Sequence, residues 1–240
     1  MNGKDEIIKK TKSKGYWVIN LHPDTYIENR IKTRAEVKEI VRNSVVDLRG
    51  WDYPHFRDSG GEPDVTTSGI EKFVDRRNHI EFWRMTQSGN FIHLLALRED
   101  WWGDIEYRNM WSRGDELKGK KLLGVYGTLF TLSEILEFAK RLAKQNIFGE
   151  NAVVKIELYN ILNRHLFIDL YNKMPFDPTP FAKVEGPWRW DKSYSVTEVM
   201  SNVEDLALEA FLDLVDLFGW ENPPVDNLKN EQQKFLEGKL

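Results

Sequence analysis

The sequence predicts an α+β domain with a mixed, mainly antiparallel sheet, in which a central β-hairpin over residues 79–97 is covered by about three helices. The hairpin is the clearest local pattern, because two runs rich in apolar residues flank the turn-forming Gln87-Ser-Gly-Asn90. Both faces of this pair are apolar, which is typical of strands inside a sheet that is covered on both sides. Three amphipathic segments, each opened by a Thr or Ser with a Glu three residues later, supply the helices.

The first regular element is a predicted strand at Tyr16–Leu21, a short run rich in β-forming residues. A capping box that starts at Thr33 predicts a helix over 34–43. Val45–Leu48 follows as another strand-like run. Residues 57–69 are polar and contain Gly and Pro, so we expect a loop there.

The hairpin pairs His79–Thr86 with Phe91–Leu97. A two-residue turn between these strands would place Arg84 opposite His93 on one face of the sheet. An arginine beside a histidine can bind an anion such as phosphate or carboxylate. The alternative is a structural pair that is bonded to a nearby carboxylate or carbonyl group.

The second half of the chain alternates strand-like runs with two long amphipathic patterns. Capping boxes at Thr131 and Ser195 predict helices over 132–146 and 196–218. Residues 172–194 contain four prolines and are expected to form an irregular connection. The strand-like runs of this half are Leu122–Tyr126, Val153–Tyr159 and Leu166–Leu170.

The two ends of the chain lack such patterns. Residues 1–14 are polar and rich in Lys, so we expect a flexible arm, and residues 221–240 predict a loose polar tail, which leaves a single domain over 15–220. The N-terminus lacks the apolar core of a signal peptide, and no apolar run reaches the roughly 18 residues of a membrane-spanning helix. We therefore expect a cytoplasmic protein with no membrane partner.

Composition excludes several chemistries. The 240 residues contain no cysteine, which rules out disulfides, thiolate metal sites and cysteine nucleophiles. The five histidines form no metal-binding motif, and the glycine-rich phosphate loops and the G-x-S-x-G nucleophile motif are absent. We expect neither a metal site nor a cofactor. The net charge is −4, and residues 181–240 alone carry −6, so the chain lacks the basic balance of a typical nucleic-acid-binding protein.

The strongest candidate site is a loop over 47–57, where two arginines, a histidine, acids and three aromatic residues gather after a predicted strand. Arginine and aromatic side chains suit nucleotides or single-stranded nucleic acid. With the hairpin residues Arg84 and His93, the loop predicts a non-catalytic binding or sensor module for an anionic ligand, expected to be a nucleotide or nucleic acid. The alternative is a rim loop whose rings pack on the domain and whose charges pair with each other. The expected ligand-binding residues of the loop are Arg49, Trp51, Asp52, His55 and Arg57.

Two other functions fit the sequence. A hydrolase or nuclease could use the 47–58 loop, provided that Asp52, His55 and nearby carboxylates converge in one cleft. A protein–protein adaptor would bind its partner through exposed tryptophans or through the acidic face of the 196–218 helix. The tryptophans concerned are Trp101, Trp102 and Trp111.

Overall fold

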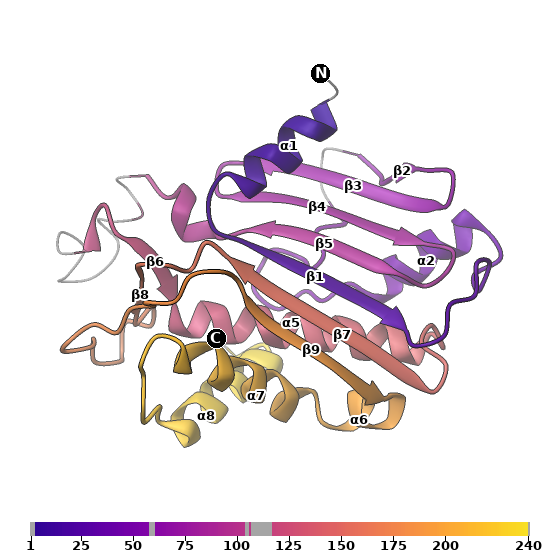
Figure 1. Ribbon diagram of the computed structural model, residues 1–240. Coiled ribbons are helices and arrows are strands. Elements are labelled where there is room, and N and C mark those ends of the chain that lie inside the picture. The colour runs from indigo at the N-terminus through magenta and orange to yellow at the C-terminus, as the bar shows by residue number, and fades with distance from the viewer. Residues whose placement is uncertain (1–2, 58–60, 104–105, 107–116, 240) are drawn as a thin grey trace.

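The main feature of the computed structural model, which describes residues 3–57, 61–103, 106 and 117–239, is a seven-stranded antiparallel sheet (Figure 1). Its strands are β1 (Tyr16–Pro23), β2 (Asp64–Val65), β3 (Gly69–Arg76), β4 (His79–Thr86), β5 (Phe91–Ala96), β7 (Asn151–Tyr159) and β9 (Trp188–Ser195). The order across the sheet is β2-β3-β4-β5-β1-β7-β9. The β4–β5 hairpin therefore lies in the middle of the sheet, which confirms the α+β class and the central hairpin.

A second, two-stranded sheet lies beside the start of the longest helix. It is formed by β6 (Lys121–Gly124) and β8 (Arg164–Phe167), which pair in parallel. The short 3-10 helix η1 (Arg98–Trp101) packs against β6. The sequence predicted one mixed sheet. In the structure the parallel pair forms this separate small sheet, and the main sheet is purely antiparallel.

The helices cover the main sheet unequally (Figure 1). The long α5 (Val125–Lys144) runs along one face, with α2 (Arg34–Ser44) beside it against β3 and β4. The opposite face carries α1 (Gly3–Lys12) over β3, β4 and β5. The remaining helices, α6 (Val196–Ser201), α7 (Val203–Asp216) and α8 (Val225–Leu236), pack on the far side of α5. None of the helices in the described ranges is long and apolar enough to cross a membrane.

The core lies between the sheet and α5. Every second residue of β1 and β7 is buried, as the two-residue period of a strand requires, and these side chains meet α5. Because α5 lies between the sheet and three further helices, 15 of its 20 residues are buried. The capping boxes at Thr33 and Ser195 are both formed, so these two predicted helix starts are confirmed.

The turn of the central hairpin is longer than the sequence predicted. Residues 87–89 form it, and Gly89 adopts a φ of 85°, as a three-residue turn requires. The strands consequently pair with Trp83 facing His93. A shift of one position moves a side chain to the other face of a sheet, so Arg84 lies on the face opposite His93 and the predicted Arg84–His93 pair is wrong.

Both ends of the chain are helical, where the sequence predicted a flexible arm over 1–14 and a loose tail over 221–240. In α1 the side chain of Thr11 is fully buried, and two lysines bind acids of β3. In α8, Leu228 and Phe235 are fully buried against the rest of the domain. Each helix contacts the domain through few apolar residues, so the sequence pattern was too sparse to reveal it.

Several boundaries in the second half also differ from the prediction. The predicted strand at Leu122–Tyr126 ends at Gly124, where α5 begins directly. Thr131 therefore lies inside α5, and its hydroxyl donates to the carbonyl oxygen of Gly127 one turn earlier instead of capping a helix. The predicted helix over 196–218 is divided at Asn202 into α6 and α7.

Three strands of the sheet were not predicted, and one predicted strand is absent from the described chain. β2 lies inside the predicted loop over 57–69. β3 follows the polar loop directly, and β9 lies in the proline-containing stretch that was expected to be irregular. Val45–Leu48 forms only an isolated bridge between Val46 and Tyr53. That bridge ties together the two ends of the short loop that carries the candidate site.

Candidate functional site

A cavity of about 250 Å³ lies between the main sheet, the first turns of α5 and the loop that contains Trp51. The loop contributes residues 49–53, the sheet contributes β4 and the end of β5, and η1 and α5 complete the wall. Charged side chains from several elements converge on its wall, and a concave site with converging charged groups is a candidate for ligand binding. The charged lining residues are Arg49, Asp52, Glu81, Arg98, Glu99 and Glu134.

The wall formed by α5 holds an ion pair between Arg49 and Glu134. The Nε of Arg49 donates to Oε1 of Glu134 at 3.1 Å, and its Nη2 donates to the hydroxyl of Thr131 at 2.9 Å. Glu134 is only 2% exposed. Burial raises the pKa of Glu134 to about 7, although the charge of Arg49 opposes the shift. This carboxyl therefore changes its charge in the physiological pH range.

We expect the raised pKa of Glu134 to make folding stability depend on pH. The folded chain holds this proton more tightly than the unfolded chain, whose carboxyl has a pKa near 4.5, so the stabilisation is present at low pH and is lost as the pH rises to 7. Between pH 5 and pH 8, the free energy of unfolding of the wild type should fall by roughly 2 kcal/mol more than that of Glu134→Gln. Urea titrations of both proteins at the two pH values measure this difference.

The comparison with Glu134→Gln is needed because His79 changes the stability with pH in the opposite direction. Burial lowers the pKa of His79 to about 4, and the charge of Arg98 adds to the shift, so the contribution of His79 rises with pH between 4 and 6.5. Since His79 is present in both proteins, its effect cancels. Parallel pH profiles for the two proteins would show that Glu134 has an ordinary pKa.

Trp51 lies between two histidines. Its ring centroid is 3.8 Å from that of His55 and 3.9 Å from that of His79, with interplanar angles of 14° and 20°. The two imidazole rings are nearly parallel to the indole and about equally close to it, so they would collide with each other if both lay on the same face of Trp51. His55 and His79 therefore cover opposite faces of the indole. Neither face of Trp51 is therefore open to a nucleobase, and the expected stacking of a base on this ring is not available in this structure.

Asp52 holds the loop in shape. One carboxylate oxygen binds Nδ1 of His55, and the other accepts the backbone N–H groups of Phe56 and Arg57 at 3.0 and 2.9 Å. Burial opposes ionisation, but these hydrogen bonds outweigh it and lower the pKa of Asp52. Asp52 and His55 are thus bound to each other, and the hydrolase or nuclease that would use them stays a hypothesis.

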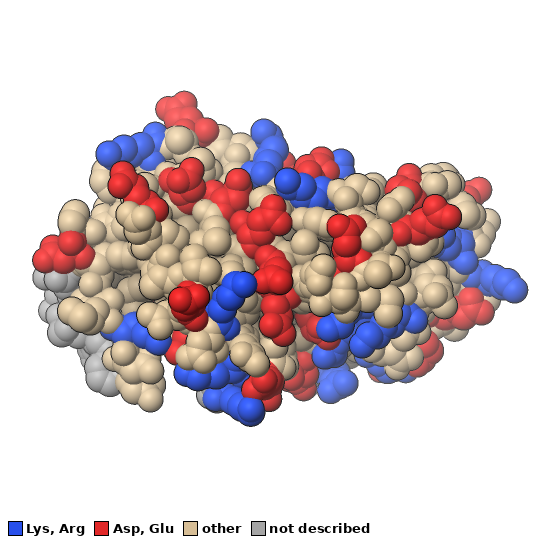
Figure 2. Space-filling model, turned by 90° about the horizontal axis from the view of Figure 1, so that it is seen from below, with Lys and Arg blue, Asp and Glu red and all other residues tan. Residues whose placement is uncertain are grey.

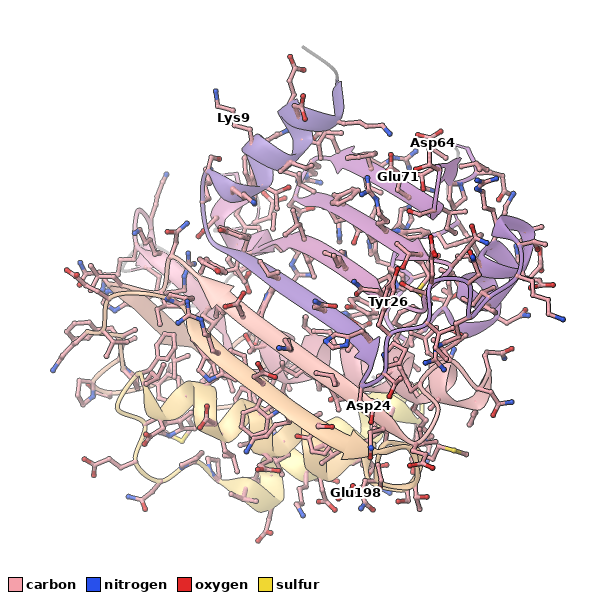
Figure 3. All side chains as sticks on the ribbon, turned by 45° about the vertical axis from the view of Figure 1, so that its right-hand side comes forward. Lys9, Asp24, Tyr26, Asp64, Glu71 and Glu198 are labelled. Carbon is pink, nitrogen blue, oxygen red and sulfur yellow. The ribbon has the colours of Figure 1, made fainter. Side chains whose placement is uncertain are left out.

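The other expected site residues lie outside the cavity. Arg57 is exposed and pairs with Asp47 at 3.7 Å. Arg84 pairs with Glu71, which is labelled in Figure 3, on the outer face of the sheet. His93 is fully buried behind the cavity. Of the seven residues expected from the sequence, the structure brings Arg49, Trp51 and Asp52 into the cavity wall.

The cavity also contains residues that the sequence analysis did not select. Glu81 lies in the hairpin and Glu134 was considered only as a helix cap, while His79 begins β4 and Arg98 and Glu99 lie in η1. A signal for Glu81 existed, because an acid within an otherwise apolar strand is costly to bury unless it has a partner. No local sequence pattern marks the other four residues, because they come from separate elements that meet only in the folded chain.

The surfaces of the predicted adaptor are only partly described. Trp101 is half-buried, with the ammonium of Lys14 4.2 Å from its ring centroid, and Trp102 packs on Phe167 at 5.6 Å. Trp111 lies outside the described residues. Figure 2 shows acidic side chains across the middle of the face seen from below, and α7 exposes five acids to solvent. The acids of α7 are Glu204, Asp205, Glu209, Asp213 and Asp216.

No cluster of three or more metal-ligating side chains occurs among the residues that the structure describes. No protein-family model, curated protein or solved structure matches the chain. The function must therefore be argued from the cavity itself.

Proposed function

We propose that the chain is a non-catalytic binding module that takes up a small anionic ligand in this cavity. The observation that carries the proposal is the position of Arg98. Its side chain is exposed and lines the cavity, and it forms no ion pair with any residue in the described ranges. A guanidinium at the wall of a concave site is a suitable partner for a carboxylate or phosphate group.

Arg49 supplies a second guanidinium to the same wall. It is held in place by Glu134 and Thr131, so its position is fixed before any ligand binds. Preorganisation of this kind lowers the cost of binding. Because the pKa of Glu134 is raised to about 7, protonation of this carboxyl leaves Arg49 as an uncompensated cation at the site.

The dimensions of the site favour a small molecule over a nucleic-acid chain. A volume of about 250 Å³ lies just below the range of roughly 300–1,000 Å³ that is usual for ligand pockets. The wall also contains carboxylates, which repel a polyanionic backbone. Both faces of Trp51 are covered by histidines. We therefore propose a metabolite-sized anion, with a mononucleotide as the largest candidate.

Titration of inorganic phosphate and AMP against the wild type and Arg98→Ala tests this proposal. Both probes should stabilise the wild type against heat, and Arg98→Ala should weaken their binding by about tenfold or more, because a charge-assisted hydrogen bond contributes roughly 1.5–3 kcal/mol. Thermal unfolding followed by tryptophan fluorescence at increasing probe concentrations yields the affinities.

Arg189→Ala is the matched control. Arg189 lies on β9, at the far edge of the sheet, and is also exposed, but it pairs with Glu157 of β7. It should leave the affinity for both probes unchanged. A wild type that binds neither probe, or an Arg98→Ala protein that binds both as tightly as the wild type, would refute the proposed anion site.

A further inference from the structure

The carboxylate of Glu81 is the least satisfied group of the cavity wall. Glu81 is only 2% exposed, and its Oε2 is bound to Nε2 of His93 at 2.7 Å. Its Oε1 is buried as well and has no hydrogen-bond partner within the described chain. A buried carboxylate oxygen without a donor is costly. Since Glu81 lines the cavity, the missing donor can come from a bound ligand.

Glu81 is held in position by a chain of side chains behind the cavity. Because a carboxylate oxygen only accepts, Nε2 of His93 must be the donor to Glu81. The other ring nitrogen of His93 lies 3.2 Å from the hydroxyl of Tyr53. Burial raises the pKa of Tyr53 well above its usual value, so this phenol keeps its proton and can donate a hydrogen bond to Nδ1 of His93. Tyr53 and His93 are thus positioning residues that fix the orientation of Glu81.

The charge of the wall favours a cation next to Glu81. The lining contains two arginines against four carboxylates. The oxygens of Asp52 accept from His55 and the backbone, and Glu134 binds Arg49. Glu99 accepts the backbone N–H of Gly124 at 3.3 Å. Among the four, Glu81 is the one with a buried oxygen that lacks a partner in the described chain.

From this arrangement we infer that the ligand is a zwitterion, with a protonated amine that binds Oε1 of Glu81 and an anionic group that binds Arg98. This inference rests on the proposed function and names the ligand class, which is a small amine that also carries a phosphate or carboxylate. Glu81 and Arg98 line the same cavity of about 250 Å³, so a molecule of amino-acid size can reach both. The ammonium would supply the donor that Oε1 lacks.

Phosphoethanolamine and ethyl phosphate form a suitable pair of probes, because they share the phosphate ester and differ in the amine. By calorimetry, the wild type should bind phosphoethanolamine about tenfold or more tightly than ethyl phosphate, as expected for one charge-assisted contact. The ratio should fall to about one in Glu81→Gln. In Tyr53→Phe the ratio should fall part of the way, which a purely structural role of the hydroxyl would not produce because it would weaken both ligands alike.

Glu157→Gln is the control, since Glu157 is an acid of β7 that pairs with Arg189 and lies outside the cavity. It should keep the wild-type ratio. Equal affinity of the wild type for the two probes would overturn the inference and leave the anion site standing. If neither phosphate probe binds, the proposed function fails, and ethanolamine then tests Glu81 alone: binding that Glu81→Gln abolishes supports the amine site, and no binding overturns it.

Discussion

Replacing Arg164 by Met should lower the free energy of unfolding by about 3–5 kcal/mol. Arg164 is fully buried, and its guanidinium binds both oxygens of Asp100 at 2.8 and 2.7 Å. It also donates to the carbonyl oxygen of Leu122 at 2.6 Å. The same Asp100 accepts the backbone N–H of Gly15 at 2.7 Å. This ion pair therefore ties the start of β1, η1, β6 and β8 together.

The large effect follows from what the substitution leaves behind. Methionine has a similar volume, but it cannot bind Asp100, whose carboxylate is only 10% exposed and would lose its cation. Arg164→Lys keeps the charge and loses the two-point contact, so an intermediate loss is expected. Urea unfolding of the three proteins, followed by tryptophan fluorescence, measures these differences.

The exposed pair between Arg189 and Glu157 serves as the control for Arg164. The side chain of Arg189 is 64% exposed, and surface ion pairs contribute about 0–1 kcal/mol. Arg189→Met should therefore have little effect on stability. If Arg164→Met were as stable as Arg189→Met, the buried ion pair would not hold these segments together as the structure shows.

Local patterns were sufficient to predict much of the fold. The run of β-forming residues in β1 and the capping boxes at Thr33 and Ser195 depend on neighbouring residues only, and all three predicted features appear in the structure. The central hairpin was predicted for the same reason. Its register was not, because the turn includes Gln87 as well as Ser88 and Gly89, and this third residue moves Arg84 to the other face.

The candidate site was only partly predictable because it combines distant parts of the chain. The loop around Trp51 stood out by composition, and three of the residues expected to bind a ligand, Arg49, Trp51 and Asp52, line the cavity. The partners that give the cavity its charge, Glu134 on α5 and Arg98 on η1, lie far away in the sequence. Only the antiparallel order of the sheet and the packing of α5 bring them beside the loop.

A second large loss of stability is expected for a substitution in α8, the segment that the sequence predicted to be a loose tail. Phe235 is fully buried in α8, and its ring stacks on Phe130 of α5 with centroids 4.4 Å apart. Phe235→Ala should lower the free energy of unfolding by about 3–5 kcal/mol, because it removes buried apolar surface and leaves a cavity between two helices. Urea unfolding of the full-length chain measures the loss.

Val225→Ala in the same helix is the control, because it shortens an exposed side chain and leaves the packed face of α8 intact. Val225 is 37% exposed, so its truncation should change the free energy of unfolding by about 0.5 kcal/mol or less. Two variants that both unfold like the wild type would mean that α8 does not pack on α5 and that the tail is loose in solution. A large loss for Phe235→Ala alone would show that a helix with few apolar residues is part of the core, because its contact surface is concentrated in Leu228 and Phe235.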